Sequence, residues 1–167
     1  DHRDLHSFPT RRSSDLFGVS VTYIEQEAPL GLAHAVKISE EFMAGDSFVM
    51  YLGDNLIKDG IVPFVQEFER EKPEAQILLA KVARPWEFGV AELEGERVVR
   101  LEEKPKQPRS DLALVGVYLF TKTIFDAVRA IKPSPRGELE ITDAIQYLIS
   151  TGRNVRSHVI HGWWKDT

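Results

Sequence analysis

Cysteine is absent from the 167-residue sequence, which excludes disulfide bonds and thiolate metal sites. Long apolar runs are absent too, since none approaches the roughly 18 residues that a membrane-spanning helix needs. Positive charge is not in excess, because the formal net charge is −5 and the pI is about 5.6. Surfaces that bind nucleic acid or anionic membranes are usually basic, so we expect neither partner, although a local pocket for a small phosphate ligand remains compatible. A cytoplasmic location is the default expectation.

Several catalytic signatures are also missing. The sequence contains neither a G-x-x-x-x-G-K-[ST] phosphate loop nor a G-x-G-x-x-G dinucleotide loop. Nothing resembles a nucleophile elbow, so a hydrolase triad has no support. We expect His34 to be structural, and His158 and His161 have no partner at metal-ligand spacing.

Residues 1–16 show neither helical nor strand periodicity and contain no apolar signal-peptide core. Their segment His6–Leu16 (HSFPTRRSSDL) resembles the translation of a sequencing-adapter oligonucleotide. We therefore interpret residues 1–16 as a non-native tail and expect the biological sequence to begin near Phe17. Because the chain also stops abruptly at Thr167, we expect residues 17–167 to be part of a longer domain.

From Val19 onward, segments with strand and helix patterns alternate. The apolar run Phe48–Leu52, bounded by turn residues, predicts a strand buried on both faces of a sheet. A helix is expected from Gly31 to about Met43, and Thr142 is a plausible N-cap for a helix that ends at Gly152. The other predicted strands are Val19–Gln26, Gln76–Val82, Phe88–Leu93, Arg97–Lys104, Leu112–Phe120 and Val155–Ile160, and the other helices Ile61–Lys72 and Thr121–Ile131. This pattern predicts an α/β fold with a mixed, mostly parallel sheet flanked by helices.

A few charged residues could carry chemistry at strand ends, where such sheets bind ligands. Asp54 follows Phe48–Leu52 and could hold a divalent cation, but G-D-N is also a good turn tripeptide, and the local sequence alone favours the turn. Glu103 and Lys104 end a predicted hairpin strand, where they could meet a sugar and a phosphate or simply form a solvated charge cluster. Asp166 could be a second metal carboxylate or an exposed side chain. The order and spacing of these signals strengthen the case more than any one of them.

Short sequence blocks occur in an order that resembles the sugar-phosphate nucleotidyltransferase family, most closely its glucose-1-phosphate thymidylyltransferase branch in the long, archaeal-type form. The blocks are Q-E-A-P-L-G-L-A-H-A (26–35), Y-L-G-D-N (51–55), E-F-G-V (87–90), L-E-E-K-P (101–105), L-V-G-V-Y (114–118), R-G-E-L-E-I-T-D (136–143) and W-W-K-D-T (163–167). They extend over the chain from about Phe17 to Thr167. The resemblance implies a Rossmann-like nucleotidyltransferase catalytic domain.

The resemblance further implies transfer of a nucleoside monophosphate from dTTP, a nucleoside triphosphate, to glucose 1-phosphate, which gives dTDP-glucose and pyrophosphate. Mg²⁺ would be the cofactor, held by Asp54 and Asp166, and these two residues and Lys104 would form the catalytic group. The implied substrate contacts are Gln26 and Gly31 with the base, Gly89 and Glu103 with the sugar, Lys104 with the sugar phosphate, and Val115 and Tyr118 along the sugar side.

Two alternatives remain open. Uridylyl transfer to glucose 1-phosphate is close, because uracil and thymine present similar edges, and a non-catalytic regulatory module would keep the same fold. The presence of both Asp54 and Asp166 argues against the second alternative. The family's first βα unit, with its glycine-rich triphosphate loop and catalytic lysine, has no counterpart in this sequence. We therefore expect negligible transferase activity from the chain as it stands and an exposed central sheet edge, and homo-oligomers of the intact protein are compatible with the resemblance.

Overall fold

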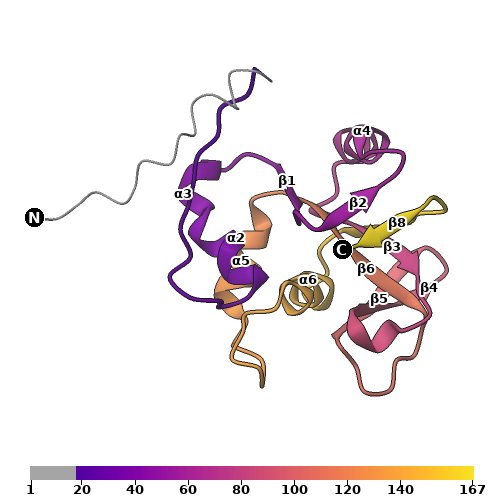
Figure 1. Ribbon diagram of the computed structural model, residues 1–167. Coiled ribbons are helices and arrows are strands. Elements are labelled where there is room, and N and C mark those ends of the chain that lie inside the picture. Colours follow the sequence, from indigo (N-terminus) through magenta and orange to yellow (C-terminus); the bar gives the residue numbers. More distant parts are fainter. Residues whose placement is uncertain (1–17) are drawn as a thin grey trace, which may run out of the picture.

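The computed structural model describes residues 18–167, and Figure 1 shows their helices packed around a central sheet. Six strands form this sheet in the order β5-β4-β6-β3-β7, with β1 also paired to β6, and β2 and β8 form a separate two-stranded sheet. The strands are β1 (Phe48–Tyr51), β2 (Asn55–Ile57), β3 (Ala75–Lys81), β4 (Gly89–Glu94), β5 (Arg97–Glu103), β6 (Leu112–Phe120), β7 (Val155–Val159) and β8 (Trp164–Asp166). The helices are α2 (Leu32–Ile38), α3 (Glu40–Met43), α4 (Val62–Glu71), α5 (Thr123–Ala130) and α6 (Ile141–Ser150), with a 3₁₀ turn η1 (Pro85–Glu87).

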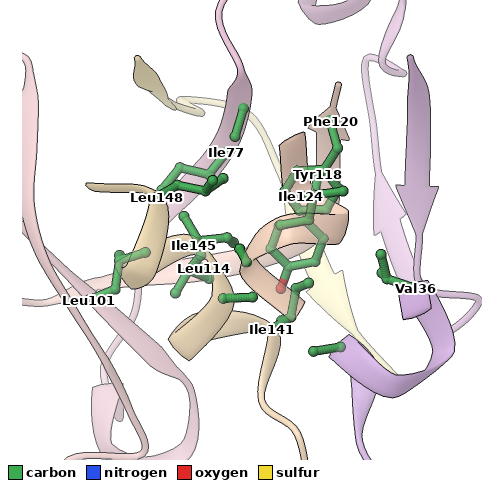
Figure 2. Close-up of a cluster of buried hydrophobic side chains, with 14 of the residues drawn as sticks. Val36, Ile77, Leu101, Leu114, Tyr118, Phe120, Ile124, Ile141, Ile145 and Leu148 are labelled. Carbon is green, nitrogen blue, oxygen red and sulfur yellow. The ribbon is translucent and has the colours of Figure 1, made fainter. Parts of the chain in front are cut away.

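The central strand β6 divides the core into two clusters, because successive side chains of a strand point to opposite faces. Leu114, Tyr118 and Phe120 pack with residues of α2, α5 and α6, as Figure 2 shows. Val115 and Val117 face the other side and pack in a second cluster that includes Phe64 of α4. Helices therefore cover both faces of a mixed sheet, as predicted. None of the described helices is long and apolar enough to cross a membrane.

The expected predominance of parallel strand pairs needs correction. Strand β6 is antiparallel to β1, β3 and β4, and β4 is antiparallel to β5. Among the described strands, β3 and β7 make the parallel pair. Strands β1, β3, β4 and β7 do point the same way, but β6 runs in the opposite direction between three of them. Sequence periodicity identifies strands without identifying their neighbours, so the pairing could not be read from it.

The predicted strand Val19–Gln26 was wrong. This segment has no strand pairing in the described structure, and its side chains Val19, Val21 and Tyr23 are exposed. A strand depends on its hydrogen-bonded neighbour, and no described strand lies beside this segment. The strand at Phe48–Leu52 exists as β1 but is only partly buried, because within residues 18–167 it pairs with β6 alone.

Two helix boundaries also differ from the prediction. The helix expected to continue to about Met43 is divided at Ser39, whose hydroxyl donates to the carbonyl of Ala35 at 2.8 Å. Thr142 is not an N-cap, because α6 begins at Ile141 and Glu140 occupies the N-cap position, two residues before Thr142. Thr142 instead directs its hydroxyl away from the helix backbone to Glu103.

One edge of β6 is shared by β1 and β4, and this arrangement positions the candidate site. β1 pairs with residues 117–120 of β6, and the register of β4 reaches Ala113. In the described chain, residues 114–116 thus have no strand partner on that edge. Just beyond β1, the N–H of Leu52 donates to the carbonyl of Gly116 at 2.8 Å. The two-stranded sheet β2-β8, which the sequence did not predict, lies next to this opening.

Candidate active site

A cavity opens beside the unpaired stretch of β6, between the end of β1 and the start of β4. Acidic, basic and aromatic side chains line it together with two backbone segments that carry glycine. Of the site residues predicted from the sequence, the structure brings to this cavity Asp54, Gly89, Glu103, Lys104, Tyr118 and Asp166. Gln26, Gly31 and Val115 are not among its lining residues.

Asp54 and Asp166 come from distant parts of the sequence and meet through β2 and β8. In the antiparallel register of these strands Asn55 lies opposite Asp166, and the N–H of Thr167 donates to the carbonyl oxygen of Asp54 at 3.1 Å. The Nδ2 atom of Asn55 donates to Asp54 Oδ1 at 2.8 Å and to Asp166 Oδ1 at 3.4 Å. Two carboxylates therefore lie within reach of one amide group at the cavity.

This pair of carboxylates fits Mg²⁺ better than it fits a metal that needs a complete set of protein ligands. Mg²⁺ is commonly bound through one or two carboxylates, with substrate phosphates and water as the other ligands. Within residues 18–167, no group of three or more His, Asp or Glu side chains is arranged to hold a metal ion. The pKa of Asp166 is raised by partial burial and then by the charge of Asp54, while Lys104 lowers it. A cation between the two carboxylates would relieve their mutual repulsion.

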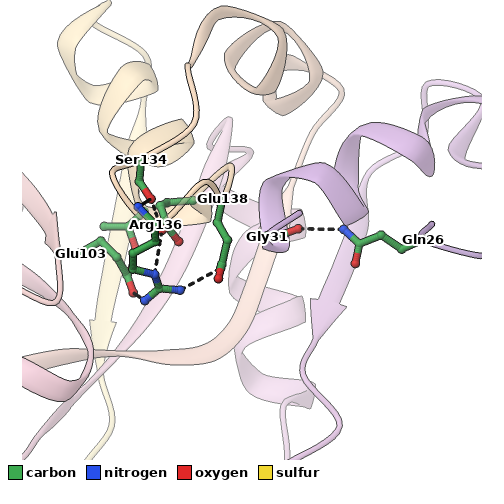
Figure 3. Close-up of polar contacts among 8 residues, drawn as sticks. Gln26, Gly31, Glu103, Ser134, Arg136 and Glu138 are labelled. Atoms are coloured by element: carbon green, nitrogen blue, oxygen red, sulfur yellow. Dashed lines mark hydrogen bonds and ion pairs between the residues drawn. The ribbon is translucent and has the colours of Figure 1, made fainter. Parts of the chain in front are cut away.

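Glu103 presents its carboxylate to the cavity from the end of β5. Its Oε2 atom accepts a hydrogen bond from Thr142 Oγ1 at 2.6 Å, and its Oε1 atom lies 3.9 Å from Arg136 Nη1 (Figure 3). Burial raises the pKa of Glu103, the hydrogen bond from Thr142 lowers it, and the charge of Glu140 raises it again. Lys104 and Arg136 also lower this pKa. The carboxylate is oriented by protein side chains and can accept hydrogen bonds from a hydroxylated ligand.

Lys104 adopts a left-handed backbone conformation with a φ of 43° immediately after β5. Its N–H donates to the carbonyl of Phe88 at 3.0 Å, which fixes this turn at the end of the β4-β5 hairpin. Positive φ is uncommon for a residue other than glycine and costs conformational energy, and such strain is often found at functional sites. The turn places the Lys104 ammonium among the lining groups of the cavity.

Gly89 lies opposite Glu103 in the β4-β5 register. A Cβ atom added to Gly89 would lie 2.6 Å from the Leu114 side chain and 2.7 Å from Thr142 Oγ1. The absence of a side chain therefore lets Glu103 and Thr142 approach the β4 backbone. This geometry is compatible with the expected backbone contact to a sugar, and it also gives Gly89 a packing role.

Tyr118 is 4% exposed and lies against the cavity from the middle of the sheet. Burial raises its pKa, and the charges of Glu103 and Asp166 raise it further, so the phenol stays protonated at neutral pH. Val115, which was expected beside it, is fully buried in the second core cluster instead. The next residue, Gly116, lines the cavity, because neighbouring residues of β6 face opposite sides of the sheet.

Gln26 and Gly31 lie together just outside the cavity, at the start of α2. The Nε2 atom of Gln26 donates to the carbonyl of Gly31 at 3.1 Å (Figure 3) and lies 3.0 Å from His34 Nδ1. Gly31 has a φ of 97°, and a Cβ atom there would collide with the backbone of Leu139. Leu32, the next residue, does line the cavity. The pair is therefore adjacent to the site, and Gly31 has a structural role in addition to any contact with a base.

The family described as nucleotidyl transferase matches residues 4–167. The chain belongs to the nucleotidyl transferase family. This finding confirms the family that the ordered sequence blocks implied.

Relatives of this chain include glucose-1-phosphate thymidylyltransferase of Streptomyces antibioticus, 60% identical over 153 residues that make up 90% of this chain and 43% of that protein. UTP–glucose-1-phosphate uridylyltransferase AglF of Haloferax volcanii is 36% identical over 89% of this chain and 62% of that protein. A structure from Bacillus anthracis, described as a glucose-1-phosphate thymidylyltransferase in complex with sucrose, has a TM-score of 0.84 and 41% identity over 93% of this chain and 63% of that chain. The chain thus spans less than half of the S. antibioticus relative.

Arg136 and Asn55 belong to the site but were not predicted from the sequence. Arg136 forms ion pairs with Glu138 at 2.8 Å, Glu140 at 3.4 Å and Glu103 at 3.9 Å, and Asn55 bonds to both aspartates. The signal was present, because Arg136 lies in the R-G-E-L-E-I-T-D block and Asn55 in Y-L-G-D-N. Their partners are distant in the sequence, so no local pattern distinguished them from surface charges and turn residues.

Proposed function

We propose that the protein to which this chain belongs transfers a nucleoside monophosphate from dTTP to glucose 1-phosphate and forms dTDP-glucose and pyrophosphate. The carrying observation is the convergence of Asp54 and Asp166 with Lys104 at one cavity, beside the polar wall of Glu103 and Thr142. The 60% identity to the S. antibioticus thymidylyltransferase supports thymidylyl transfer over its alternative. Uridylyl transfer is the second candidate, supported by the 36% identity to AglF.

In this proposal the chain acts by positioning its substrates and neutralising their charge, as is usual for phosphoryl transfer. Lys104 binds the phosphate of glucose 1-phosphate and directs one of its oxygens in line at the α-phosphorus of the nucleotide. Glu103 accepts hydrogen bonds from sugar hydroxyls, while Thr142 keeps the carboxylate oriented at 2.6 Å. Asp54 and Asp166 would hold Mg²⁺, which when bound neutralises the charge that develops on the phosphates.

The base is proposed to lie near the start of α2. Gln26 and Gly31 are adjacent to one another there, and Leu32 extends from the same segment to the cavity wall. A nucleotide whose phosphates approach Asp54 could therefore direct its base toward Gln26. The charged, phosphorylated substrates also support the proposal of a cytoplasmic enzyme.

A chimeric enzyme tests the proposed function. Residues 18–167 would replace the aligned segment of the S. antibioticus thymidylyltransferase, and pyrophosphate release would be measured with glucose 1-phosphate and either dTTP or UTP. We expect Mg²⁺-dependent turnover with kcat/KM higher for dTTP, and a preference for UTP would favour the uridylyl alternative. A folded chimera without turnover on either nucleotide would support a non-catalytic module.

A pair of variants of the chimera separates the metal site from general effects on folding. Asp54→Asn keeps the shape of the side chain but removes its charge, and we expect a loss of at least about 10² in kcat, of the order that one lost electrostatic contact costs. Asp59→Asn alters a nearby exposed carboxylate that does not line the cavity and should retain activity. Equal activity of the two variants would rule out Asp54 as a metal ligand.

A further inference from the structure

The side chain of Asn55 is buried between β2, β6 and β8, with the residue only 5% exposed. Its Oδ1 atom accepts hydrogen bonds from the N–H of Gly116 at 3.0 Å and from Trp164 Nε1 at 2.7 Å. Its Nδ2 atom donates to Asp54 and Asp166. The two lone pairs of the oxygen and the two hydrogens of the nitrogen are therefore all used.

The orientation of this amide follows from its partners. The N–H of Gly116 and the indole N–H of Trp164 can only donate, so the atom facing them has to be the oxygen. The nitrogen consequently faces the two carboxylates, which as ions can only accept. If the amide were flipped, its NH₂ group would face the two N–H donors and its oxygen would face the two carboxylates, so donors would face donors and acceptors would face an acceptor. The hydrogen-bond network thus fixes one orientation of Asn55.

We propose that Asn55 is a positioning residue that holds the carboxylates of Asp54 and Asp166 at the spacing of one divalent cation. The role rests on the metal site of the proposed function. Asn55 does not bind the cation. It orients one oxygen of each carboxylate toward a shared nitrogen, and because it is neutral it does so without adding a charge that would compete for the ion. Groups that orient metal ligands in this way typically change metal affinity 10–100-fold when they are removed.

Two features of the surroundings keep Asn55 in place. Gly116 allows its approach, because a Cβ atom there would lie 2.5 Å from Asn55 Nδ2 and 2.7 Å from its Cγ. Trp164, which donates to the amide oxygen, also packs edge-on against Phe88, with ring centroids 5.6 Å apart. Asn55 therefore connects the central sheet, the β2-β8 sheet and the two carboxylates. Its hydrogen bonds hold the carboxylates in a fixed position relative to both sheets.

The test measures Mn²⁺ binding to the whole chain by electron paramagnetic resonance of the free ion. Asn55→Ala should weaken Mn²⁺ binding about tenfold or more. The matched control is Ile57→Ala, which removes a side chain of the same strand β2 that packs in the second core cluster and has no contact with either carboxylate. It should change the dissociation constant no more than about twofold, because Ile57 lies opposite Trp164 in the strand register and forms no side-chain hydrogen bond that orients Asp54 or Asp166. Urea denaturation of both variants compares their stabilities.

A second measurement keeps the proposal testable if Asn55→Ala does not fold. In ¹H–¹⁵N spectra of the unaltered chain, Mg²⁺ should shift the side-chain NH₂ signals of Asn55 with the same dissociation constant as the carboxylate carbons of Asp54 and Asp166. The positioning role would be overturned if these NH₂ signals stayed unchanged while the carboxylates responded, or if Asn55→Ala and Ile57→Ala weakened Mn²⁺ binding equally. Failure of the unaltered chain to bind either ion would overturn the metal pair itself. Neither measurement involves nucleotide transfer, so absent turnover in the chimera would count against the proposed function alone.

Discussion

Replacing Lys104 with glycine should stabilise the fold while weakening the binding of glucose 1-phosphate. The left-handed conformation of Lys104, with its φ of 43°, costs an L-residue about 1 to 2 kcal/mol. Glycine adopts this conformation freely but adds about 0.5 to 1 kcal/mol of backbone entropy to the unfolded chain. The net expectation for Lys104→Gly is a gain of up to about 1.5 kcal/mol in the free energy of unfolding. The same change removes a hydrogen bond to a phosphate, worth about 1.5 to 3 kcal/mol, so affinity should fall about tenfold or more.

Lys72 offers a matched control. It has nearly the same backbone conformation, with a φ of 48° and a ψ of 47°, at the C-cap of α4, where its N–H donates to the carbonyl of Phe68 at 2.9 Å. Lys72 does not line the cavity. Lys72→Gly should therefore give a similar gain in stability and leave the affinity for glucose 1-phosphate unchanged.

Urea denaturation followed by circular dichroism gives the stabilities, and isothermal titration calorimetry gives the affinities. If Lys104→Gly were less stable than the unaltered chain while Lys72→Gly were more stable, the Lys104 side chain would have to make stabilising contacts that outweigh its strain. If Lys104→Gly bound glucose 1-phosphate as tightly as Lys72→Gly, Lys104 would not be the phosphate ligand. The interpretation that strain at Lys104 is retained for binding is supported only if Lys104→Gly raises the free energy of unfolding and lowers the affinity for glucose 1-phosphate.

Three further predictions concern the surroundings of the site. Gly31→Ala should destabilise the fold by about 3 kcal/mol or more, because strain at a φ of 97° is combined with a collision against the backbone of Leu139. The control Gly45→Ala, at a φ of 90° with open space around it, should cost about 1 to 2 kcal/mol. Equal losses of stability in urea denaturation would contradict this reasoning. Gln76→Leu removes a buried amide oxygen that has no partner among residues 18–167, together with the hydrogen bond from Nε2 to the carbonyl of Phe64 at 3.1 Å. These two effects oppose each other, so the free energy of unfolding should change by less than about 1 kcal/mol, and a loss above about 2 kcal/mol in thermal unfolding would contradict this balance. Because the pKa of Glu103 is raised in the folded chain, this residue's contribution to stability is complete below its ordinary pKa of 4.5 and is lost as pH rises through the folded pKa. Glu103→Gln should remove this decline in the free energy of unfolding. Parallel pH profiles for the variant and the unaltered chain would refute the prediction.

Much of the fold could be predicted from local sequence patterns. Strand β6 was predicted at its observed bounds, Leu112–Phe120, and α4 within one residue at each end. Apolar runs and helical spacing predict which side chains of one segment are buried, and this prediction does not require knowing which other elements cover that segment. The prediction at Val19–Gln26 failed because it too was based on a local pattern. The alternating apolar residues are typical of a strand, but a strand forms only beside a hydrogen-bonded neighbour.

The site was less accessible to physical reasoning from the sequence. Asp54 alone favoured a turn, and Asp166 alone favoured an exposed residue. Their convergence depends on the pairing of β2 and β8, strands of three residues each whose partners lie more than a hundred residues apart in the chain. The order of the sequence blocks suggested this convergence, and periodicity did not. Val115 and Gly116 show the same limit at finer scale, because a difference of one position on β6 exchanges the cavity for the core.

The cavity exists because β6 is longer than either strand beside it on one edge. β1 ends opposite Val117 and Val90 of β4 pairs with Ala113, so the backbone of Gly116 has no strand to pair with there in the described chain. Leu52 satisfies the Gly116 carbonyl and the side chain of Asn55 satisfies its N–H. A buried N–H left unpaired would cost about 1 to 3 kcal/mol, so the interrupted ladder requires a side-chain acceptor at this position. Asn55 meets that requirement with its oxygen and turns its nitrogen to the two carboxylates, so the residue that closes the sheet is also the one that orients the candidate metal ligands.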